Sequence, residues 1–330
     1  MSLCKIDRQT LGQWVTALLD HTTVFGPRAE RDKFVFDRLE KASELRLDHD
    51  VTVQPPKRFL QPEIEPLISY TQEGEYQSVT DNSPFVLFGV HPYDVAAITQ
   101  MDEVFQSDNY DAHYMNRRNN ATIVACDVQN PSRNVFAASM GTATVQEGFD
   151  VLLTLVGETY VVDARTEKGE DLVKHLPSAT EADEATLARR EQVWEDLQRF
   201  LKRYDLNCPP EQLPAVLAES YDHPIWEKRA EMCYSCGSCN LVCPTCYCFD
   251  MQDDPGYDLS SATRYRKWDG CMLQEFALVA GNHNFRKQRS ERFRHRFYRK
   301  GKYMHDRFGQ IACIGCGRCI TACTTNIANP

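Results

Sequence analysis

The sequence lacks the long apolar runs from which membrane-spanning helices are built. Its best candidate, residues 151–162, is interrupted by Thr154, Gly157 and Glu158, whereas a span needs roughly 18 or more apolar residues in succession. The N-terminal segment MSLCKIDRQT also lacks the basic segment followed by an apolar one that marks a secretory signal. We therefore expect no membrane span and a cytoplasmic location.

Nucleotide-binding motifs are missing as well. There is no G-x-G-x-x-G after a predicted strand and no G-x-x-x-x-G-K-[ST], the loops that hold dinucleotides and nucleoside triphosphates. No group of residues suggests a nucleophile with its base, or a binuclear metal centre. We therefore expect no catalytic residues, and no binding of nicotinamide or nucleoside triphosphate through these motifs.

What the sequence has in excess is cysteine, with 14 residues in a chain of 330. Most of them follow residue 232 in regular spacing, which indicates metal-cluster ligation in a reducing interior rather than disulfides. The apolar content of 42% and the charged content of 25% are ordinary for a soluble globular protein. The length is sufficient for about two domains.

Two cysteine runs share the spacing C-x2-C-x2-C-x3-C. The first run is Cys233, Cys236, Cys239 and Cys243, followed by Pro244, and the second is Cys313, Cys316, Cys319 and Cys323. In two-cluster ferredoxins the first three cysteines of such a run ligate one cluster and the fourth ligates the other. The spacing therefore predicts two [4Fe-4S] clusters with crossed ligands. Cluster 1 takes Cys233, Cys236, Cys239 and Cys323, and cluster 2 takes Cys313, Cys316, Cys319 and Cys243.

Two alternatives concern the metal content. Structural zinc sites are usually two C-x2-C pairs with a longer spacer, whereas three ligands within seven residues suit the corner of a cubane better. A zinc-stabilised binding module is thus the weaker alternative. Cys246, Cys248 and Cys271 lie outside the runs; they are either ligands of an additional centre or small buried hydrophobic residues beside the clusters.

Positive charge is concentrated in residues 286–302, although the net charge of the chain is −10. This basic stretch has one acid, Glu291, and the following Lys and Arg residues: Arg286, Lys287, Arg289, Arg292, Arg294, Arg296, Arg299, Lys300 and Lys302. Cations near a thiolate-ligated cluster raise its potential, so we favour a role at a cluster or partner over a merely solvated helix face. The acidic remainder would repel phosphate backbones, and no nucleic acid is expected as a partner. Lys57 and Arg58 are expected on the surface.

The first 177 residues predict an α+β docking domain. A helical pattern covers residues 5–20, short strands follow within 33–53, and an apolar strand at 84–90 precedes a helix at about 95–105. Residues 121–126 form another strand, and residues 151–162 form a hairpin about Gly157 and Glu158. Strands mixed with helices, without regular β-α-β alternation, indicate the α+β class.

The remainder predicts a helical bridge, residues 178–220, and an α-helical ferredoxin-like domain, residues 221–330. Ser178 and Glu181 have the spacing of a capping box at the start of a helix that ends near Tyr204. Residues 223–232, 271–280 and 286–303 are also expected as helices. The two cluster loops would thus be separated by helical segments.

The whole chain resembles a known family. The phrases PPKRFLQP, FGVHPYD, CGSCNLVCPTCYCFD, WDGC and RFGQIACIGCGRCITAC are similar to those of the dicluster iron–sulfur subunit of anaerobic sulfite reductases. The same family includes the β subunit of soluble nickel–iron (sulf)hydrogenases. The resemblance implies an electron-transfer subunit between a flavoprotein that oxidises NAD(P)H and a sirohaem or nickel–iron catalytic subunit. The iron–sulfur subunit of a heterodisulfide-reductase-type complex is the alternative.

The chain departs from this family in its N-terminal part. The resemblance implies cysteines at three positions that hold Tyr93, Val135 and Ala137 here, and only Cys126 lies nearby. If relatives bind an additional centre at these positions, we expect that this chain has lost it.

Overall fold

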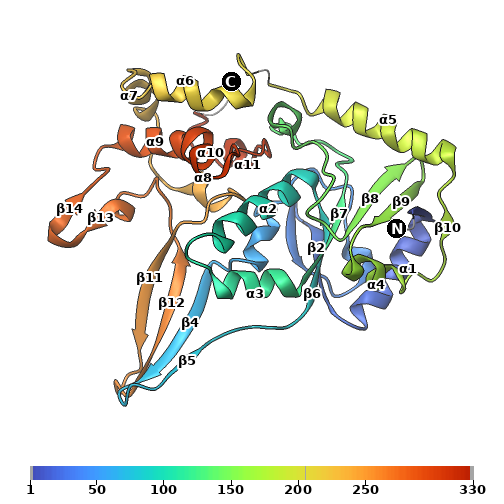
Figure 1. The fold of residues 1–330 in the computed structure, drawn as a ribbon, viewed down its shortest axis with the longest axis horizontal. Helices are drawn as coiled ribbons and strands as arrows, with labels where there is room; N and C mark the ends of the chain where they lie inside the picture. Colours follow the sequence, from blue (N-terminus) through green and yellow to red (C-terminus); the bar gives the residue numbers. More distant parts are fainter. Residues whose placement is uncertain (1–2, 205, 328–330) are drawn as a thin grey trace.

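The computed structural model describes residues 3–204 and 206–327. Among these residues, the larger sheet has eight strands in the order β10-β1-β9-β8-β7-β6-β2-β3 (Figure 1). Its strands are β1 (Leu3–Asp7), β2 (Thr23–Glu30), β3 (Lys33–Arg38), β6 (Phe85–Val90), β7 (Ala121–Cys126), β8 (Val151–Val156), β9 (Thr159–Ala164) and β10 (Thr180–Glu181). The expected α+β class is confirmed, but its parallel centre, β2-β6-β7-β8, was not predicted.

Strand β6 shows why this sheet is buried on both faces. Its residues are all buried, and they alternate between two hydrophobic cores as the period of a strand requires. Val86 and Phe88 pack in the core that contains Trp14, from helix α1 (Arg8–Leu19). Leu87 packs in the opposite core with Ile98, from helix α2 (Pro92–Gln106). Helices on both faces are what a parallel centre needs.

Helices pack on both faces of this sheet, and shorter helices recur in the C-terminal part. Besides α1 and α2 they are α3 (Ala112–Asn120), α4 (Glu167–Val173), α5 (Glu184–Phe200), α6 (Leu213–Glu219), α7 (Ile225–Ala230), α8 (Ser238–Leu241), α9 (Arg289–Tyr298), α10 (Met304–Phe308) and α11 (Arg318–Thr321). A π-helical turn, Arg299–Tyr303, joins α9 to α10. The predicted helix at 286–303 is therefore confirmed in its main part.

A smaller sheet joins two segments that lie far apart in the sequence. Its order is β11-β12-β4-β5, formed by β4 (Ile64–Thr71), β5 (Tyr76–Ser78), β11 (Phe249–Pro255) and β12 (Ser261–Trp268). It projects from the body of the molecule (Figure 1). We expected residues 1–177 and 221–330 to form separate domains. Both segments contribute strands to this sheet. The boundaries of the domains stay a prediction.

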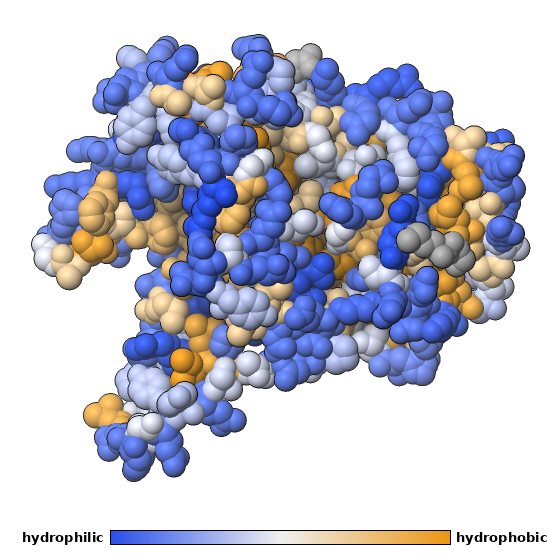
Figure 2. Space-filling view, in the orientation of Figure 1, coloured by the Kyte–Doolittle hydropathy of each residue, from blue (hydrophilic) through white to orange (hydrophobic). Residues whose placement is uncertain are grey.

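The prediction of helices alone between the two cysteine runs was wrong. Residues 249–268 form a hairpin, and residues 271–280 hold a 3-10 turn, Glu275–Ala277, and strand β13 (Leu278–Val279). Strand β13 pairs with β14 (His283–Asn284), and Gly281 between them has a φ of 79°, which reverses the chain there. Figure 2 shows this hairpin as a second projection with exposed apolar residues, separated from the smaller sheet by a hollow.

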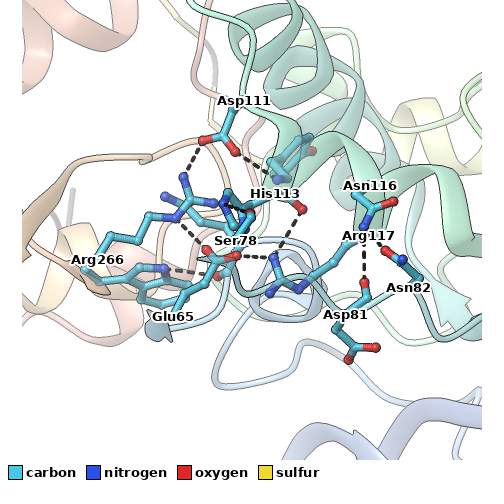
Figure 3. Close-up of polar contacts among 12 residues, drawn as sticks. Glu65, Ser78, Asp81, Asn82, Asp111, His113, Asn116, Arg117 and Arg266 are labelled. Atoms are coloured by element: carbon cyan, nitrogen blue, oxygen red, sulfur yellow. Dashed lines mark hydrogen bonds and ion pairs between the residues drawn. The ribbon is translucent and has the colours of Figure 1, made fainter. Parts of the chain in front are cut away.

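A buried ionic network fastens the smaller sheet to the larger domain (Figure 3). Glu65, on β4, accepts hydrogen bonds from Arg266 on β12 and from Arg117 on α3. Arg266 also donates to Asp111, the N-cap residue of α3. The side chains of Glu65 and Arg266 are 0% and 3% exposed. Because removing one member of such a network leaves a buried unpaired charge, these residues hold the two chain segments together.

Helix α5 begins later than predicted. Asp183, and not Ser178, caps it by accepting from the backbone N–H of Thr186. The capping box was wrong because Thr180 and Glu181 instead form β10, which pairs with β1 at the edge of the sheet. Near its other end, Leu197 packs with Ile314 and Cys316 of the second cysteine run, so the helix does connect the two parts of the chain.

Candidate metal centre

The two cysteine runs adopt the same loop conformation. In each run the second and fourth residues after the first cysteine have positive φ angles: 56° at Ser235 and 76° at Gly237, and 67° at Gly315 and 75° at Gly317. Each loop then enters a short helix, α8 or α11, and these two helices pack against each other. The repeated left-handed residues curl both loops in the same way around their thiols.

Polar groups lie beside the cysteine sulfurs. The backbone N–H of Ser235 donates to Cys233 Sγ at 3.3 Å. A hydroxyl lies two residues beyond three of the cysteines, in the pairs Cys236–Ser238 at 3.3 Å, Cys243–Thr245 at 3.4 Å and Cys323–Thr325 at 3.6 Å. Hydrogen bonds and dipoles next to a thiolate stabilise its charge, so these loops suit thiolate ligands.

The fourth cysteine of each run lies with the first three of the other run. Cys233 interacts electrostatically with Cys239, Cys236 and Cys323. In the second run, Cys313, Cys316 and Cys319 all interact with Cys243. The Oγ1 atom of Thr324, next to Cys323, lies 4.0 Å from Cys236 Sγ. The thiols of the two runs thus lie near one another, with Cys323 close to the first run and Cys243 close to the second; the crossed ligand sets stay a prediction.

The helix after the β13–β14 hairpin brings two cations to these thiols. Arg296 donates from Nε to Cys239 Sγ at 3.1 Å and from Nη2 to the Cys239 carbonyl at 3.0 Å. Burial alone would lower the pKa of Arg296, but the thiolates of Cys239, Cys319, Cys246 and Cys243 hold it well above its usual value. Lys300 donates from Nζ to the carbonyl and hydroxyl of Thr245 at 2.9 and 2.6 Å.

The two groups of thiols differ in their surroundings. Cys236 is exposed, and the hydroxyl and backbone N–H of Ser238 lower its pKa. Cys316 is 7% exposed, and burial raises the pKa of its thiol well above the usual value despite the nearby guanidinium of Arg318. One group therefore reaches the surface, whereas the other lies in the interior.

Cys243 and Cys246 form a close pair of thiols. The pKa of Cys243 is lowered, mainly by the hydrogen bond from Cys246. Together with the nearby charges of Lys300 and Arg296, this bond outweighs the opposite effect of burial. The same bond and burial raise the pKa of Cys246.

The second loop is seated on the backbone of the N-terminal domain. Phe136 donates from its N–H to the Gly315 carbonyl at 2.7 Å, and Thr142 donates to the Ile314 carbonyl at 2.7 Å. A Cβ atom on Gly315 would lie 2.6 Å from the Phe136 oxygen, and one on Gly317 would lie 2.3 Å from the Asn134 oxygen. Glycine is therefore required at both positions by close packing as well as by positive φ.

Arg318 locks this loop to the same domain. Its guanidinium donates to both carboxylate oxygens of Asp94, at 2.6 and 2.7 Å, and to the carbonyl and hydroxyl of Thr52, at 2.8 and 3.1 Å. The side chains of Arg318 and Asp94 are 2% and 3% exposed. A bidentate pair this deeply buried is geometrically specific, and it fixes the second loop against α2 and the segment around Thr52.

Comparison with known proteins supports this description. Residues 232–327 match the family described as a 4Fe-4S dicluster domain. Over the full length, the chain is 32% identical to sulfhydrogenase 2 subunit beta of Pyrococcus furiosus, with 99% of this chain and 96% of that protein covered. The chain belongs to the sulfhydrogenase beta-subunit family. The resemblance expected from the sequence is thereby confirmed.

The cofactors of this chain, a member of the sulfhydrogenase beta-subunit family, are two [4Fe-4S] clusters. The side chains fit them: the two runs offer eight thiols on loops of the same conformation, with N–H, hydroxyl or cationic groups beside several of the sulfurs. Bound there, each cluster supplies a site that takes up and releases one electron.

Cys246 and Cys271 share a hydrogen-bond donor. The side-chain amide of Asn240 donates to Cys246 Sγ at 3.6 Å and to Cys271 Sγ at 3.4 Å. Cys248 lies close enough to Cys271 to interact electrostatically, although burial is the main cause of its raised pKa, about 11. The structure thus places Cys246 and Cys271 at Asn240, and Cys248 near Cys271. A role for them in an additional centre stays a hypothesis.

The three positions at which the family resemblance implied cysteines lie together in this fold. Tyr93, Val135 and Ala137 pack in one apolar core with Ile314 and Cys316. Cys126 packs instead in the core on the α1 face of the sheet. In this chain an apolar core therefore lies beside the second cysteine run at these positions.

Several residues of the site were not found from the sequence. Arg318 and Asn240 were overlooked, although the C-G-R-C of the second run differs visibly from the C-G-S-C of the first. Lys57 was wrongly expected on the surface: it is 3% exposed and donates to the Cys246 carbonyl. Its stem is covered by Trp268, whose ring centroid lies 4.2 Å from Nζ, and a buried ammonium of this kind has no sequence signature.

The search for membrane-spanning helices gave a negative result. Among residues 3–204 and 206–327, no helix has both the length and the apolar character that crossing a membrane requires.

Proposed function

We propose that this chain is the electron-transfer subunit of a cytoplasmic oxidoreductase complex. It relays electrons between a flavoprotein subunit that oxidises NAD(P)H and a catalytic subunit, either a nickel–iron hydrogenase or a sirohaem sulfite reductase. Membership of the sulfhydrogenase beta-subunit family supports this function, since the relative is named as a subunit of a sulfhydrogenase. The chain itself carries no proposed catalytic residue.

The proposed ligands follow the crossed arrangement. Cluster 1 is held by Cys233, Cys236, Cys239 and Cys323, and cluster 2 by Cys313, Cys316, Cys319 and Cys243. The observation that carries the proposal is the proximity of Cys323 to the first run and of Cys243 to the second. Because each run contributes to both clusters, the two clusters are close neighbours, as electron relay between them requires.

The chain controls access to each cluster separately. Cys236 is exposed, so cluster 1 is positioned to exchange electrons with a partner subunit. Cys316 is buried under Tyr93 and Leu197, and this apolar cover excludes water from cluster 2. Electrons therefore enter or leave through cluster 1 when a partner docks at that surface.

The test is anaerobic purification from the native host, with iron, acid-labile sulfide and co-eluting subunits measured together. We expect about eight irons and eight sulfides per chain, with a flavoprotein and a nickel or sirohaem subunit. A disulfide reductase chain in place of these partners would favour the alternative complex, and zinc without sulfide would overturn the proposal.

Cysteine variants test the ligand sets. Cys236→Ser and Cys316→Ser should each lose or convert one cluster, seen as two different changes in the EPR spectrum of the reduced protein. Cys208→Ser, outside both runs, is the matched control and should keep both signals. Unchanged iron content and spectra in both ligand variants would contradict the assignment.

A further inference from the structure

Two cations on one helical segment match two ligands on the first cysteine run. Arg296 and Lys300 are four residues apart, on α9 and the π-helical turn that follows it. Cys239 and Cys243 are also four residues apart. Arg296 hydrogen-bonds to Cys239 Sγ at 3.1 Å, and Lys300 lies against Cys243. The first pair belongs to cluster 1, and the second to cluster 2.

The ammonium group of Lys300 provides the positive charge beside Cys243. The hydroxyl of Thr245 lies 3.4 Å from Cys243 Sγ, but its one proton is donated to the Ala312 carbonyl at 2.6 Å. Lys300 donates to that hydroxyl oxygen at 2.6 Å, and its side chain is buried, with 7% of the residue exposed. The ammonium, rather than the hydroxyl, therefore supplies positive charge beside this sulfur.

Other cations of the basic stretch do not reach the thiols in this way. Arg294 stacks over Tyr221, with its guanidinium carbon 3.8 Å from the ring centroid, and donates to the Tyr221 carbonyl. Arg292 donates to the Ser235 hydroxyl and to the carbonyls of Met272, Arg286 and Lys287, and its interaction with the Cys233 thiol is electrostatic. The two cations that face sulfur are thus distinguished by their contacts, although the sequence shows only an undivided run of charge.

We propose that Arg296 and Lys300 set the reduction potentials of the two clusters separately, Arg296 for cluster 1 and Lys300 for cluster 2. The proposal rests on the crossed ligand sets proposed above. A cation beside a ligating sulfur stabilises the reduced cluster, which carries one more negative charge, and so raises its potential. The effect is strong where water is excluded. Both residues act through the ligands and are positioning residues, not catalytic ones.

We expect the two residues to differ in how selectively each affects the potential of one cluster. Lys300 acts on cluster 2 through Cys243. Arg296 donates a hydrogen bond to Cys239 Sγ of cluster 1 at 3.1 Å, and it also interacts electrostatically with Cys319, Cys243 and Cys313 of cluster 2. Removing Arg296 should therefore lower the potentials of both clusters, and that of cluster 1 most, because the direct hydrogen bond to a ligand is lost there. Removing Lys300 should lower that of cluster 2 most.

The experiment is a potentiometric titration of the full-length chain, monitored by EPR, for the Arg296→Gln and Lys300→Gln variants. Signals are assigned to clusters with Cys236→Ser and Cys316→Ser. Arg294→Gln is the matched control, since it removes one charge from the same helix without touching a thiol. Iron and sulfide are measured in each sample, so that a lost cluster is not mistaken for a shifted one.

We expect Lys300→Gln to lower the potential of cluster 2 most, Arg296→Gln to lower the potential of cluster 1 more than that of cluster 2, and the control to lower neither. If Arg296→Gln shifts cluster 2 at least as much as cluster 1, if Lys300→Gln shifts cluster 1 more than cluster 2, or if Arg294→Gln shifts the signals equally, the inference is wrong. An unsubstituted chain with two signals and unshifted variants would refute this inference alone, while the proposed function would stand. If a glutamine variant loses a cluster, Arg296→Lys and Lys300→Arg replace it; each keeps the charge but alters the contact, and a smaller shift of the same signal is expected.

Discussion

The first and second cysteine runs have the same spacing and the same loop, but they are built into different surroundings. The first run includes the exposed Cys236 and is backed by a small core of Trp226, Phe293 and Tyr298. The second run rests on the N-terminal domain through Gly315, Gly317 and Arg318. Two equal motifs thus give one loop with an exposed cysteine, Cys236, and one loop with a buried cysteine, Cys316.

The difference is concentrated at equivalent positions. Ser238 in the first run corresponds to Arg318 in the second, and Ser235 corresponds to Gly315. The Ser238 hydroxyl lies 3.3 Å from Cys236 Sγ of its own loop, whereas Arg318 reaches Asp94 and Thr52. Cluster geometry therefore constrains the cysteines and the positive φ angles, while the residues between the cysteines decide where each loop is fastened.

The largest effect is expected from Arg318→Ser, which gives the second run the residue of the first. It leaves Asp94 buried without its partner, and the free energy of unfolding should fall by about 3–5 kcal/mol. Anaerobic urea unfolding, followed by tryptophan fluorescence, measures this change. Ser238→Ala is the control, expected to change stability by about 0.5 kcal/mol. Equal stability of the two variants would remove the distinction between the loops.

Gly317→Ala and Gly237→Ala form a second matched pair, because their φ angles are 75° and 76°. At either position, alanine in the left-handed conformation costs about 1 kcal/mol. A Cβ atom on Gly237 meets the flexible side chain of Leu273, whereas one on Gly317 meets the Asn134 backbone. We therefore expect Gly317→Ala to lose the irons of cluster 2 and Gly237→Ala to keep both clusters. The measurement is the iron content of the two variants, and equal iron content in Gly317→Ala and Gly237→Ala would contradict the packing argument.

Metal removal should also separate the two sites. With an iron chelator under anaerobic conditions, the absorbance of the clusters should decay in two phases. The fast phase belongs to cluster 1, because Cys236 is exposed and Cys316 is 7% exposed. Cys236→Ser identifies this phase by altering it. A single phase, or a fast phase altered only by Cys316→Ser, would be evidence against the difference in access.

The smallest effect is expected from Cys271→Ala. The Asn240 amide lies at hydrogen-bond distance from both Cys271 and Cys246, so we expect the variant to keep the iron of the unsubstituted chain. Iron per chain in the two proteins is the measurement, with Cys208→Ala as the control. A loss of iron confined to Cys271→Ala would establish an additional centre and give the molecule a third site to compare.

The sequence predicted those features that depend on local patterns. The spacing of Cys233 to Cys243 and of Cys313 to Cys323 indicated two clusters, and apolar runs located strands β6, β7 and the β8–β9 hairpin. Spacing alone, however, is identical in the two runs, so it carried no information about which site is buried. That depends on contacts such as Arg318 with Asp94, which are 224 residues apart.

The errors have the same physical origin. Every residue of β11 is exposed, so it lacks the alternation by which a half-buried strand is recognised. Its sheet exists because β12 pairs with β4, from the other half of the chain. Likewise, the start of α5 was misplaced because Thr180 and Glu181 pair with β1. Local propensity was overruled in each case by a distant partner.

The shared smaller sheet has a consequence for biosynthesis. Glu65 and Arg266 are 201 residues apart, and at a translation rate of 5–20 residues per second roughly 10 to 40 s separate their appearance. During that interval β4 has an unpaired edge, and Glu65 awaits one of its two guanidinium partners. The nascent N-terminal half therefore cannot complete its own surface before the first cysteine run has left the ribosome. Strand closure and iron delivery consequently fall in the same late window of synthesis.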